Sequence, residues 1–204
     1  MPENVSSRLR CGLPLDDADF DQLFPQWARD LSTIHWTPVE VARRAAELLV
    51  VRPGVRVLDV GAGVGKFCLV GALAAPGVFY GIEQRLHFVK AARETAQRLG
   101  LRNARFLHGN MMALEWYGFD AFYLYNPFAE NLTSVTDPID TTIDRDLSLF
   151  RAYVHFVRQK LHLARRGARV ATYHGFGGEM PPDYRLELEE QCGTERLELW
   201  VKVC

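Results

Sequence analysis

The sequence lacks the residue patterns that mark several large classes of protein. Its four cysteines lie far apart, with no C-x-x-C pair, so we expect reduced thiols rather than a disulfide framework. None of its six histidines stands at the H-x-x-x-H or H-E-x-x-H spacing of a metal-binding helix, and we expect no metal site. The longest stretch without a charge, residues 67–82, is interrupted by glycine and proline and is too short to span a bilayer.

An excess of charge of either sign is also missing. Lysine and arginine number 24, aspartate and glutamate 25, and the net charge is -1. A basic cluster within residues 158–169 surrounds the end of a predicted helix, where the helix dipole favours cations. We therefore expect no nucleic-acid partner. The N-terminus has no apolar core of a signal peptide, which together with the reduced cysteines predicts a soluble cytoplasmic protein without a membrane partner.

Residues 1–36 differ from the rest of the chain. Four apolar residues recur there at the spacing of one helix face: Phe20, Phe24, Trp27 and Leu31. Two compatible interpretations of this helical N-terminal extension stay open, a helix packed on the following domain and a lid over an active site. Residues 37–204 form the predicted main domain, which opens with a helix capped by Thr37 and carrying Pro38 at its first position.

Strands and helices alternate along the main domain. Helical apolar patterns are separated by short apolar runs typical of buried strands, and the last two strands follow one another closely. Alternation predicts a parallel sheet with helices on both faces, whereas two closely linked strands must pair antiparallel. The predicted fold is a doubly wound α/β sheet of seven strands, mostly parallel, with the last strand antiparallel. The strands are expected at residues 55–60, 78–82, 104–108, 119–125, 168–174, 184–190 and 197–203.

A glycine-rich loop follows the first predicted strand and opens a helix. It reads Asp59-Val60-Gly61-Ala62-Gly63-Val64-Gly65, whereas a dinucleotide-binding fingerprint would place its third glycine at position 66, which is Lys66. The D-x-G-x-G-x-G spacing resembles the cofactor loop of the class I, S-adenosylmethionine-dependent methyltransferases. The resemblance implies S-adenosylmethionine as cofactor, with Asp59 near its methionine amino group. It also implies that Gly61, Ala62, Gly63 and Gly65 let the backbone pass close to the cofactor.

The ends of the next two predicted strands supply further candidate cofactor contacts. Glu83 ends the second strand, where an acid can accept hydrogen bonds from both hydroxyls of a ribose, and Gln84 follows it. The methyltransferase family commonly has an acid at the position of Asn110, against the adenine amino group. The amide oxygen of Asn110 can accept that bond without a charge. Met111 packs on the adenine ring or belongs to the core; both interpretations stay open.

The fourth predicted strand ends in Tyr125-Asn126-Pro127-Phe128. These residues resemble the Asn-Pro-Pro-aromatic motif of amino-methylating enzymes, with one proline instead of two. The resemblance implies that Asn126 lies between cofactor and acceptor and holds the acceptor nitrogen, with Tyr125 and Phe128 as walls. A strand-ending turn with a buried phenylalanine is the alternative.

A weaker, local similarity to the non-SET histone lysine methyltransferases covers scattered segments within residues 57–130. It rests on the glycine loop, the acid at the end of the second strand and the segment Asn126-Pro127-Phe128-Ala129.

The predicted function is S-adenosylmethionine-dependent methyl transfer to a nucleophile, with the amine of a protein lysine or of a small molecule as acceptor. Residues 1–36 hold six acidic and three basic residues, which suits a cationic acceptor. Because the sequence ends at Cys204, we expect recognition to fall to residues 1–36 and 127–144. Two alternatives remain: a non-catalytic S-adenosylmethionine-binding scaffold or sensor, and an NAD-dependent oxidoreductase.

Overall fold

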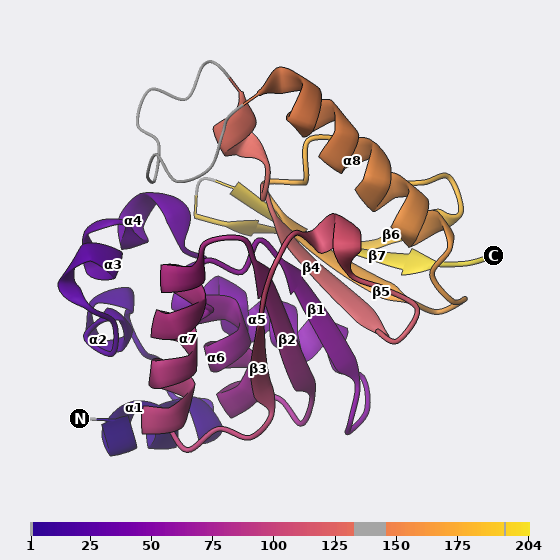
Figure 1. Cartoon of the computed structure of the whole chain (residues 1–204). Coiled ribbons are helices and arrows are strands. Elements are labelled where there is room, and N and C mark those ends of the chain that lie inside the picture. The colour runs from indigo at the N-terminus through magenta and orange to yellow at the C-terminus, as the bar shows by residue number, and fades with distance from the viewer. Residues whose placement is uncertain (1, 133–145, 194) are drawn as a thin grey trace.

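One mixed sheet organises the chain, and its strand order places the ends of β1 and β4 side by side (Figure 1). The computed structural model describes residues 2–132, 146–193 and 195–204. Across this part of the chain seven strands pair in the order β3-β2-β1-β4-β5-β7-β6. The strands are β1 (Arg56–Val60), β2 (Val78–Glu83), β3 (Ala104–His108), β4 (Ala121–Tyr125), β5 (Arg169–Tyr173), β6 (Tyr184–Cys192) and β7 (Glu195–Lys202).

The predicted topology is confirmed, including the antiparallel last strand. Strands β1 to β5 pair parallel, with Val57 opposite both Phe79 of β2 and Ala121 of β4. Strand β7 lies between β5 and β6 and is antiparallel to both. The short link after β6 requires this arrangement, because a parallel connection would need a long crossover.

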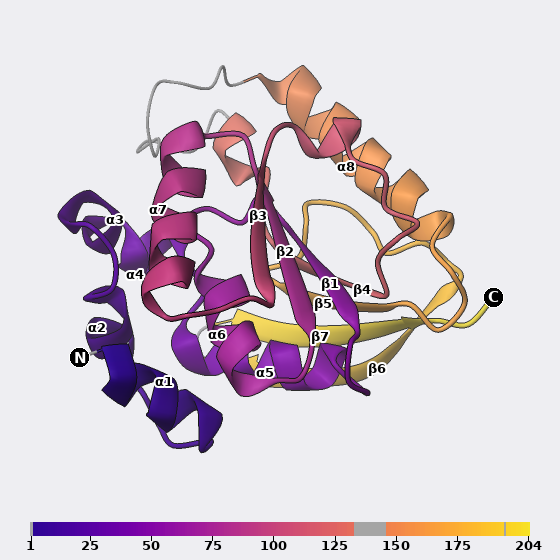
Figure 2. The ribbon, with the colours of Figure 1, turned by 60° about the horizontal axis from the view of Figure 1, so that its bottom comes forward.

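Helices cover both faces of the sheet (Figure 2). One face packs on α5 (Val39–Leu49), α6 (Lys66–Ala74) and α7 (Leu86–Arg98), and the other packs on α8 (Leu147–His162). Alternation along the strands sends Val57 to the first core and Leu58 to the second. Two short 3₁₀ helices, η1 (Met111–Ala113) and η2 (Ala129–Asn131), follow β3 and β4. In the described part of the chain no helix combines the length and apolar character needed to cross a membrane.

The N-terminal extension is helical, but the single helix predicted over residues 20–31 is wrong. The segment forms α1 (Pro2–Arg10), α2 (Asp17–Asp21), α3 (Gln26–Asp30) and α4 (Ser32–His35). Pro25 has an extended backbone, lacks an N–H and starts α3, so the helical register breaks before it. Phe20 and Phe24 are buried, while Trp27 is 37% exposed.

The start of α5 also differs from the prediction. Pro38, not Thr37, occupies the N-cap position, and the Thr37 hydroxyl bonds the Tyr123 hydroxyl at 3.0 Å. Asp17 supplies the missing cap, because its carboxylate accepts the Val39 N–H at 2.9 Å. The N-terminal extension therefore completes a helix of the main domain.

Candidate active site

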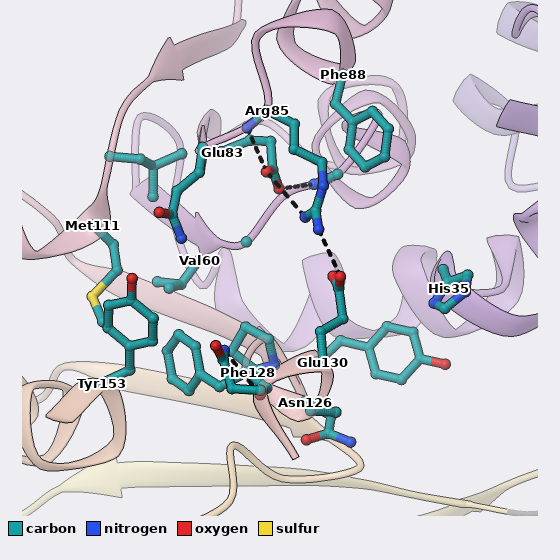
Figure 3. A pocket seen from close by; sticks show the side chains of 18 of the residues that line it. His35, Val60, Glu83, Arg85, Phe88, Met111, Asn126, Phe128, Glu130 and Tyr153 are labelled. Carbon is teal, nitrogen blue, oxygen red and sulfur yellow. Dashed lines mark hydrogen bonds and ion pairs between the residues drawn. The ribbon is translucent and has the colours of Figure 1, made fainter. Parts of the chain in front are cut away.

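A cavity of about 280 Å³ lies at the carboxyl ends of β1, β2 and β4 (Figure 3). The strand order reverses between β1 and β4, which is where open α/β sheets bind ligands. The structure brings most of the predicted site residues to this cavity. Those in its wall are Gly61, Gly63, Glu83, Gln84, Met111, Tyr125, Asn126 and Phe128.

The glycine loop adopts a backbone that larger residues rarely take. Gly61, Gly63 and Gly65 have φ angles of 74°, 55° and 78°. A Cβ atom on Gly63 would lie 2.5 Å from the Trp36 ring, and one on Gly65 would lie 2.3 Å from the Phe106 ring. Positive φ and close contact together require glycine at both positions. Gly65 packs behind the loop and is not in the cavity wall.

Glu83 is held with both carboxylate oxygens directed at main-chain donors. One oxygen accepts the Gly63 N–H at 3.1 Å, and the other accepts the Arg85 N–H at 2.9 Å. Burial raises the pKa of Glu83, against the lowering effect of these bonds and of the Arg85 guanidinium. The remaining lone pairs of the carboxylate are acceptors for ligand hydroxyls.

An ion pair crosses the cavity from the β2 side to the β4 side, as Figure 3 shows. The Arg85 guanidinium pairs with Glu130 at 2.6 Å and lies 3.8 Å from Glu83. Arg85 is itself buried. Because Glu130 belongs to η2, this pair connects the segment after Asn126 to the loop that follows Glu83.

Asp59 lies in a smaller recess that adjoins the cavity. The recess shares His35, Trp36, Gly61 and Tyr125 with the main cavity. Its other lining residues are Thr37, Asp59, Ala62, Lys66, Phe67 and Tyr123. Burial raises the pKa of Asp59 to about 7, with the Cys68 thiol donating to its carboxylate at 3.5 Å and Glu83 adding to the rise. A ligand ammonium in the recess would relieve that burial cost by pairing with the carboxylate.

Asn110 lies beside the cavity rather than in its wall. Its amide oxygen accepts the Met112 N–H at 2.9 Å, and its amide nitrogen donates to the Tyr153 hydroxyl at 3.0 Å. A weaker bond joins it to Gln84 at 3.4 Å. The predicted adenine contact of Asn110 therefore competes with internal bonds, whereas buried Met111 does line the cavity.

Asn126 combines an unusual backbone with an available carboxamide. Its φ of 37° is positive, its N–H donates to the Gly175 carbonyl at 2.9 Å, and its carbonyl accepts the Ala129 N–H. Within residues 2–132, 146–193 and 195–204, no hydrogen bond occupies its side chain. Phe128 is buried with its ring 5.2 Å from the Tyr153 ring, so it is both a cavity wall and part of the core.

Several residues of the cavity wall carry no local sequence signal. They are Ile34, His35, Trp36, Arg85, Phe88, Glu130, Tyr153 and His174. They come from the N-terminal extension, α7, η2, α8 and the end of β5, and only the fold brings them together. Of the predicted recognition loop 127–144, residues 133–144 lie outside the described part of the chain.

The chemistry of the cavity suits a nucleoside with an attached amino acid. Val60, Ile82, Met111 and Phe88 supply apolar wall, Glu83 supplies hydroxyl acceptors, and Asp59 lies in the adjoining recess. Among the described residues, no group of three or more histidine, cysteine, aspartate or glutamate side chains could hold a metal ion.

Comparison with known families agrees with this geometry. A family model described as a methyltransferase domain matches residues 52–146, from before β1 to the start of α8. Residues 52–146 therefore match a methyltransferase domain, and the seven-strand sheet around them has the fold of class I methyltransferases. This confirms the predicted family, fold class and cofactor class, that of S-adenosylmethionine. The contacts assigned to individual residues stay predictions.

Three similar proteins show how far the likeness extends. The 23S rRNA (uracil(1939)-C(5))-methyltransferase RlmD of Shewanella sediminis is 34% identical over 100 residues, which is 44% of this chain and 22% of RlmD. TrmN from Thermus thermophilus has a TM-score of 0.64 at 24% identity, covering 87% of this chain and 52% of TrmN. An RNA methyltransferase from Salinibacter ruber, solved with S-adenosyl-L-homocysteine, has a TM-score of 0.59 at 18% identity. That match covers 82% of this chain and 93% of the Salinibacter chain. The present chain thus spans about a fifth of the length of the curated relatives that it matches.

The comparisons overturn one prediction and leave another without support. The expectation that nucleic acid is not a partner is wrong, because RlmD methylates 23S rRNA and the Salinibacter enzyme is an RNA methyltransferase. The net charge of -1 misled the prediction, since overall charge says little about one local binding surface. The predicted protein lysine or small-amine acceptor finds no support among these relatives. The cytoplasmic location stays a prediction.

Proposed function

We propose that this chain transfers the methyl group of S-adenosylmethionine to a nitrogen of an RNA nucleobase. The observation that carries the proposal is the single cavity that joins Glu83, at the end of β2, to Asn126, at the end of β4. The sequence similarity to RlmD and the fold shared with the Salinibacter RNA methyltransferase support RNA as the acceptor class.

Each part of the cofactor has a proposed partner among the described residues. Glu83 would accept the ribose hydroxyls, Met111 and Phe88 would flank the base, and Gly61 and Gly63 would pass under the central part. Asp59, in the adjoining recess, would pair with the methionine ammonium. The bound cofactor supplies an electrophilic methyl group, so the task of the protein is to hold an acceptor in line with it.

Asn126 is the proposed contact to the acceptor. Its carboxamide oxygen can accept a hydrogen bond from an exocyclic amine and direct the nitrogen lone pair at the methyl group. Tyr125 and Phe128 lie on either side of this position in the chain and line the same cavity, which suits a flat aromatic base.

Among the described residues no thiol lines the cavity, and this favours nitrogen over the carbon acceptor that the name of RlmD records. Carbon 5 of uracil is a weak nucleophile, and a protein nucleophile that adds to the ring can activate it. None of the described residues in the cavity wall is a cysteine. Buried Cys68 instead donates to Asp59 behind the glycine loop.

The test is methyl transfer from isotope-labelled S-adenosylmethionine to ribosomal and transfer RNA, followed by digestion and mass spectrometry of the nucleosides. We expect label in a base methylated on nitrogen. Label in 5-methyluridine would contradict the nitrogen assignment, and label in protein with none in RNA would contradict the acceptor class.

Two variants separate binding from transfer. Asn126→Ala should bind the cofactor within about threefold of wild type but transfer methyl at least tenfold more slowly, since it removes a contact to the acceptor. Exposed His155 on α8 is the matched control, and His155→Gln should transfer at the wild-type rate.

A further inference from the structure

Two histidines, His35 and His174, line the cavity, and the surroundings of the second suit it for proton transfer. We infer that His174, with its ring oriented by Glu195, accepts the proton that the acceptor nitrogen loses during methyl transfer. This inference rests on the proposed function and adds to it a residue that the sequence analysis did not single out.

The ring of His174 has a defined partner. Its Nε2 atom lies 3.0 Å from a carboxylate oxygen of Glu195, at the start of β7. In the neutral imidazole, a proton on Nε2 donates to that carboxylate, which leaves the lone pair on Nδ1. Glu195 would then stabilise the positive ring once Nδ1 has taken up a proton.

The backbone connects His174 to the proposed acceptor contact. Asn126 and His174 are the two non-glycine residues with positive φ in the described chain, at 37° and 65°. They follow β4 and β5, which are neighbours, and the Asn126 N–H donates to Gly175 directly after His174. Left-handed backbone at non-glycine residues is costly and often marks a functional site. Both strained residues line the same cavity.

The aromatic neighbours of His174 limit where its ring can lie. The ring is 6.2 Å from that of Tyr125, nearly parallel to it, and 6.3 Å from that of Tyr173. His174 thus extends the wall that Tyr125 forms beside Asn126. The side chain is 44% exposed, so a proton on the ring can pass to water.

His35 is the rival candidate. Burial lowers the pKa of His35, which keeps the ring neutral and able to accept a proton. The described residues form no ion pair with His35 and no hydrogen bond to its ring that would fix its tautomer. It also comes from the N-terminal extension, on the side of the recess that holds Asp59. His174 is therefore the better placed of the two.

The proposed step balances without a further reactant. The acceptor nitrogen forms a bond to the methyl carbon, and the carbon–sulfur bond breaks with its electron pair going to sulfur. The products are S-adenosylhomocysteine and a methylated amine that carries an extra proton. Nδ1 of His174 takes that proton and releases it to water.

The decisive test follows the proton affinity of His174 in two complexes. Side-chain NMR titration of histidine-labelled protein is run with S-adenosylmethionine and with S-adenosylhomocysteine, with His174→Asn used to assign the signal. The first ligand carries a positive sulfur and the second does not. We expect the proton affinity of His174 to be lower by about threefold or more in the S-adenosylmethionine complex, because a nearby cation disfavours a charged ring. Tyr125, Tyr173 and Glu195 contact the His174 ring, and His35, Arg85 and Glu130 are the other titratable or charged residues to consider, since they line the same cavity.

The rate of methyl transfer in variants gives the second part of the test. His174→Asn keeps a residue that tolerates positive φ and removes the imidazole, and it should slow single-turnover transfer to RNA by about 100-fold and flatten the acid side of the pH–rate profile. Added imidazole should restore part of the rate. Glu195→Gln should lower the rate less than His174→Asn does, and it should shift the pH–rate profile.

The outcomes separate this inference from the proposed function. Equal proton affinity of His174 in both complexes, or a wild-type pH–rate profile in His174→Asn, would overturn the role of His174 and leave the methyltransferase proposal intact. A loss of rate in His35→Gln without one in His174→Asn would assign the role to His35 instead. Failure of both ligands to bind would overturn the proposed function itself, and this inference with it.

Discussion

The raised pKa of Asp59 makes the proposed ligand contact of this residue sensitive to pH. Asp59 is buried at the end of β1 with the Cys68 thiol as donor, and burial raises its pKa to about 7. A carboxylate so placed is costly in the folded protein unless a cation joins it. The ammonium of S-adenosylmethionine is a suitable cation, and pH therefore reports on this contact.

Cofactor binding should weaken as Asp59 takes up a proton. Between pH 8 and pH 6 the dissociation constant should rise about tenfold, since only the ionised carboxylate pairs with the ammonium. Asp59→Asn should bind weakly at both values and lose most of this dependence. Calorimetric titrations with S-adenosylhomocysteine at the two pH values measure the effect, and an unchanged slope in the variant would assign the pH dependence to another group.

Rising pH should strengthen cofactor binding through Asp59 but should lower the stability of the folded protein. The pKa of Asp59 in the folded state lies above the value of about 3.9 in an unfolded chain, so its contribution to stability is lost as pH rises through 7. From pH 5 to pH 8 the free energy of unfolding should fall by roughly 2–3 kcal/mol more in wild type than in Asp59→Asn. Urea unfolding of both proteins measures this, and parallel profiles would show that Asp59 has an ordinary pKa.

Gly63 offers a test of the loop geometry. Gly63→Ala combines strained backbone with a clash on the Trp36 ring and should cost roughly 2–4 kcal/mol of stability or displace Trp36. Gly100 has a similar φ of 65° but no atom within 4 Å of an added Cβ, so Gly100→Ala should cost only about 1 kcal/mol. Equal losses in thermal or urea unfolding would show that backbone strain alone accounts for both.

Residues close in sequence were the predictable part of the site. The glycine loop and Glu83 follow from strand ends and spacing, because the carboxyl ends of parallel strands meet at one edge of the sheet. Trp36, Arg85 and His174 reach the cavity from elements far apart in sequence, and no local pattern reports such contacts.

At the scale of elements, Lys66 connects the N-terminal extension to the helix that follows the glycine loop. This lysine opens α6, is 2% exposed, and pairs with Asp17 at 2.6 Å and Asp21 at 2.7 Å. Asp21 also accepts the hydroxyl proton of Ser32, which lies 3.2 Å from the lysine nitrogen. We propose that the extension is a structural part of the domain rather than a mobile lid.

Lys66→Met tests this connection. It leaves the buried Asp21 carboxylate without its cation and should cost about 3–5 kcal/mol of stability. Asp21→Leu in the same chain should recover part of that loss, because it removes the unpaired charge. Breaking the exposed Arg43–Glu47 pair on α5 by Glu47→Gln is the control, expected to change stability by less than about 1 kcal/mol. A loss for Lys66→Met no larger than the control would favour a loosely attached lid.

The boundaries of elements were less predictable than their order. The strands of the sheet agree with their apolar runs. The extension does not, because Pro25 interrupts a helical spacing that its apolar residues would otherwise continue. Similarly, Thr37 has the sequence of an N-cap but bonds Tyr123 instead, a contact between residues far apart in the chain.

At the scale of the whole molecule, the fold agrees with the prediction and the acceptor is a proposal. Composition and periodicity sufficed for the sheet, since buried strands and the helices that cover them leave apolar patterns in the sequence. They did not predict the proposed RNA acceptor, because the net charge of a whole chain says little about one local surface. The similarity to RlmD overturned the expectation of no nucleic-acid partner, which composition had favoured.

The most direct test of the account is calorimetric titration of the purified protein with S-adenosylmethionine, S-adenosylhomocysteine and NAD. We expect micromolar binding of the first two ligands, no binding of NAD, and at least tenfold weaker binding of the first two to Glu83→Gln, which weakens the acceptor for the ribose hydroxyls. Binding of NAD, or no binding of the adenosyl ligands, would contradict the assignment of the cavity between β1, β2 and β4 as a site for S-adenosylmethionine.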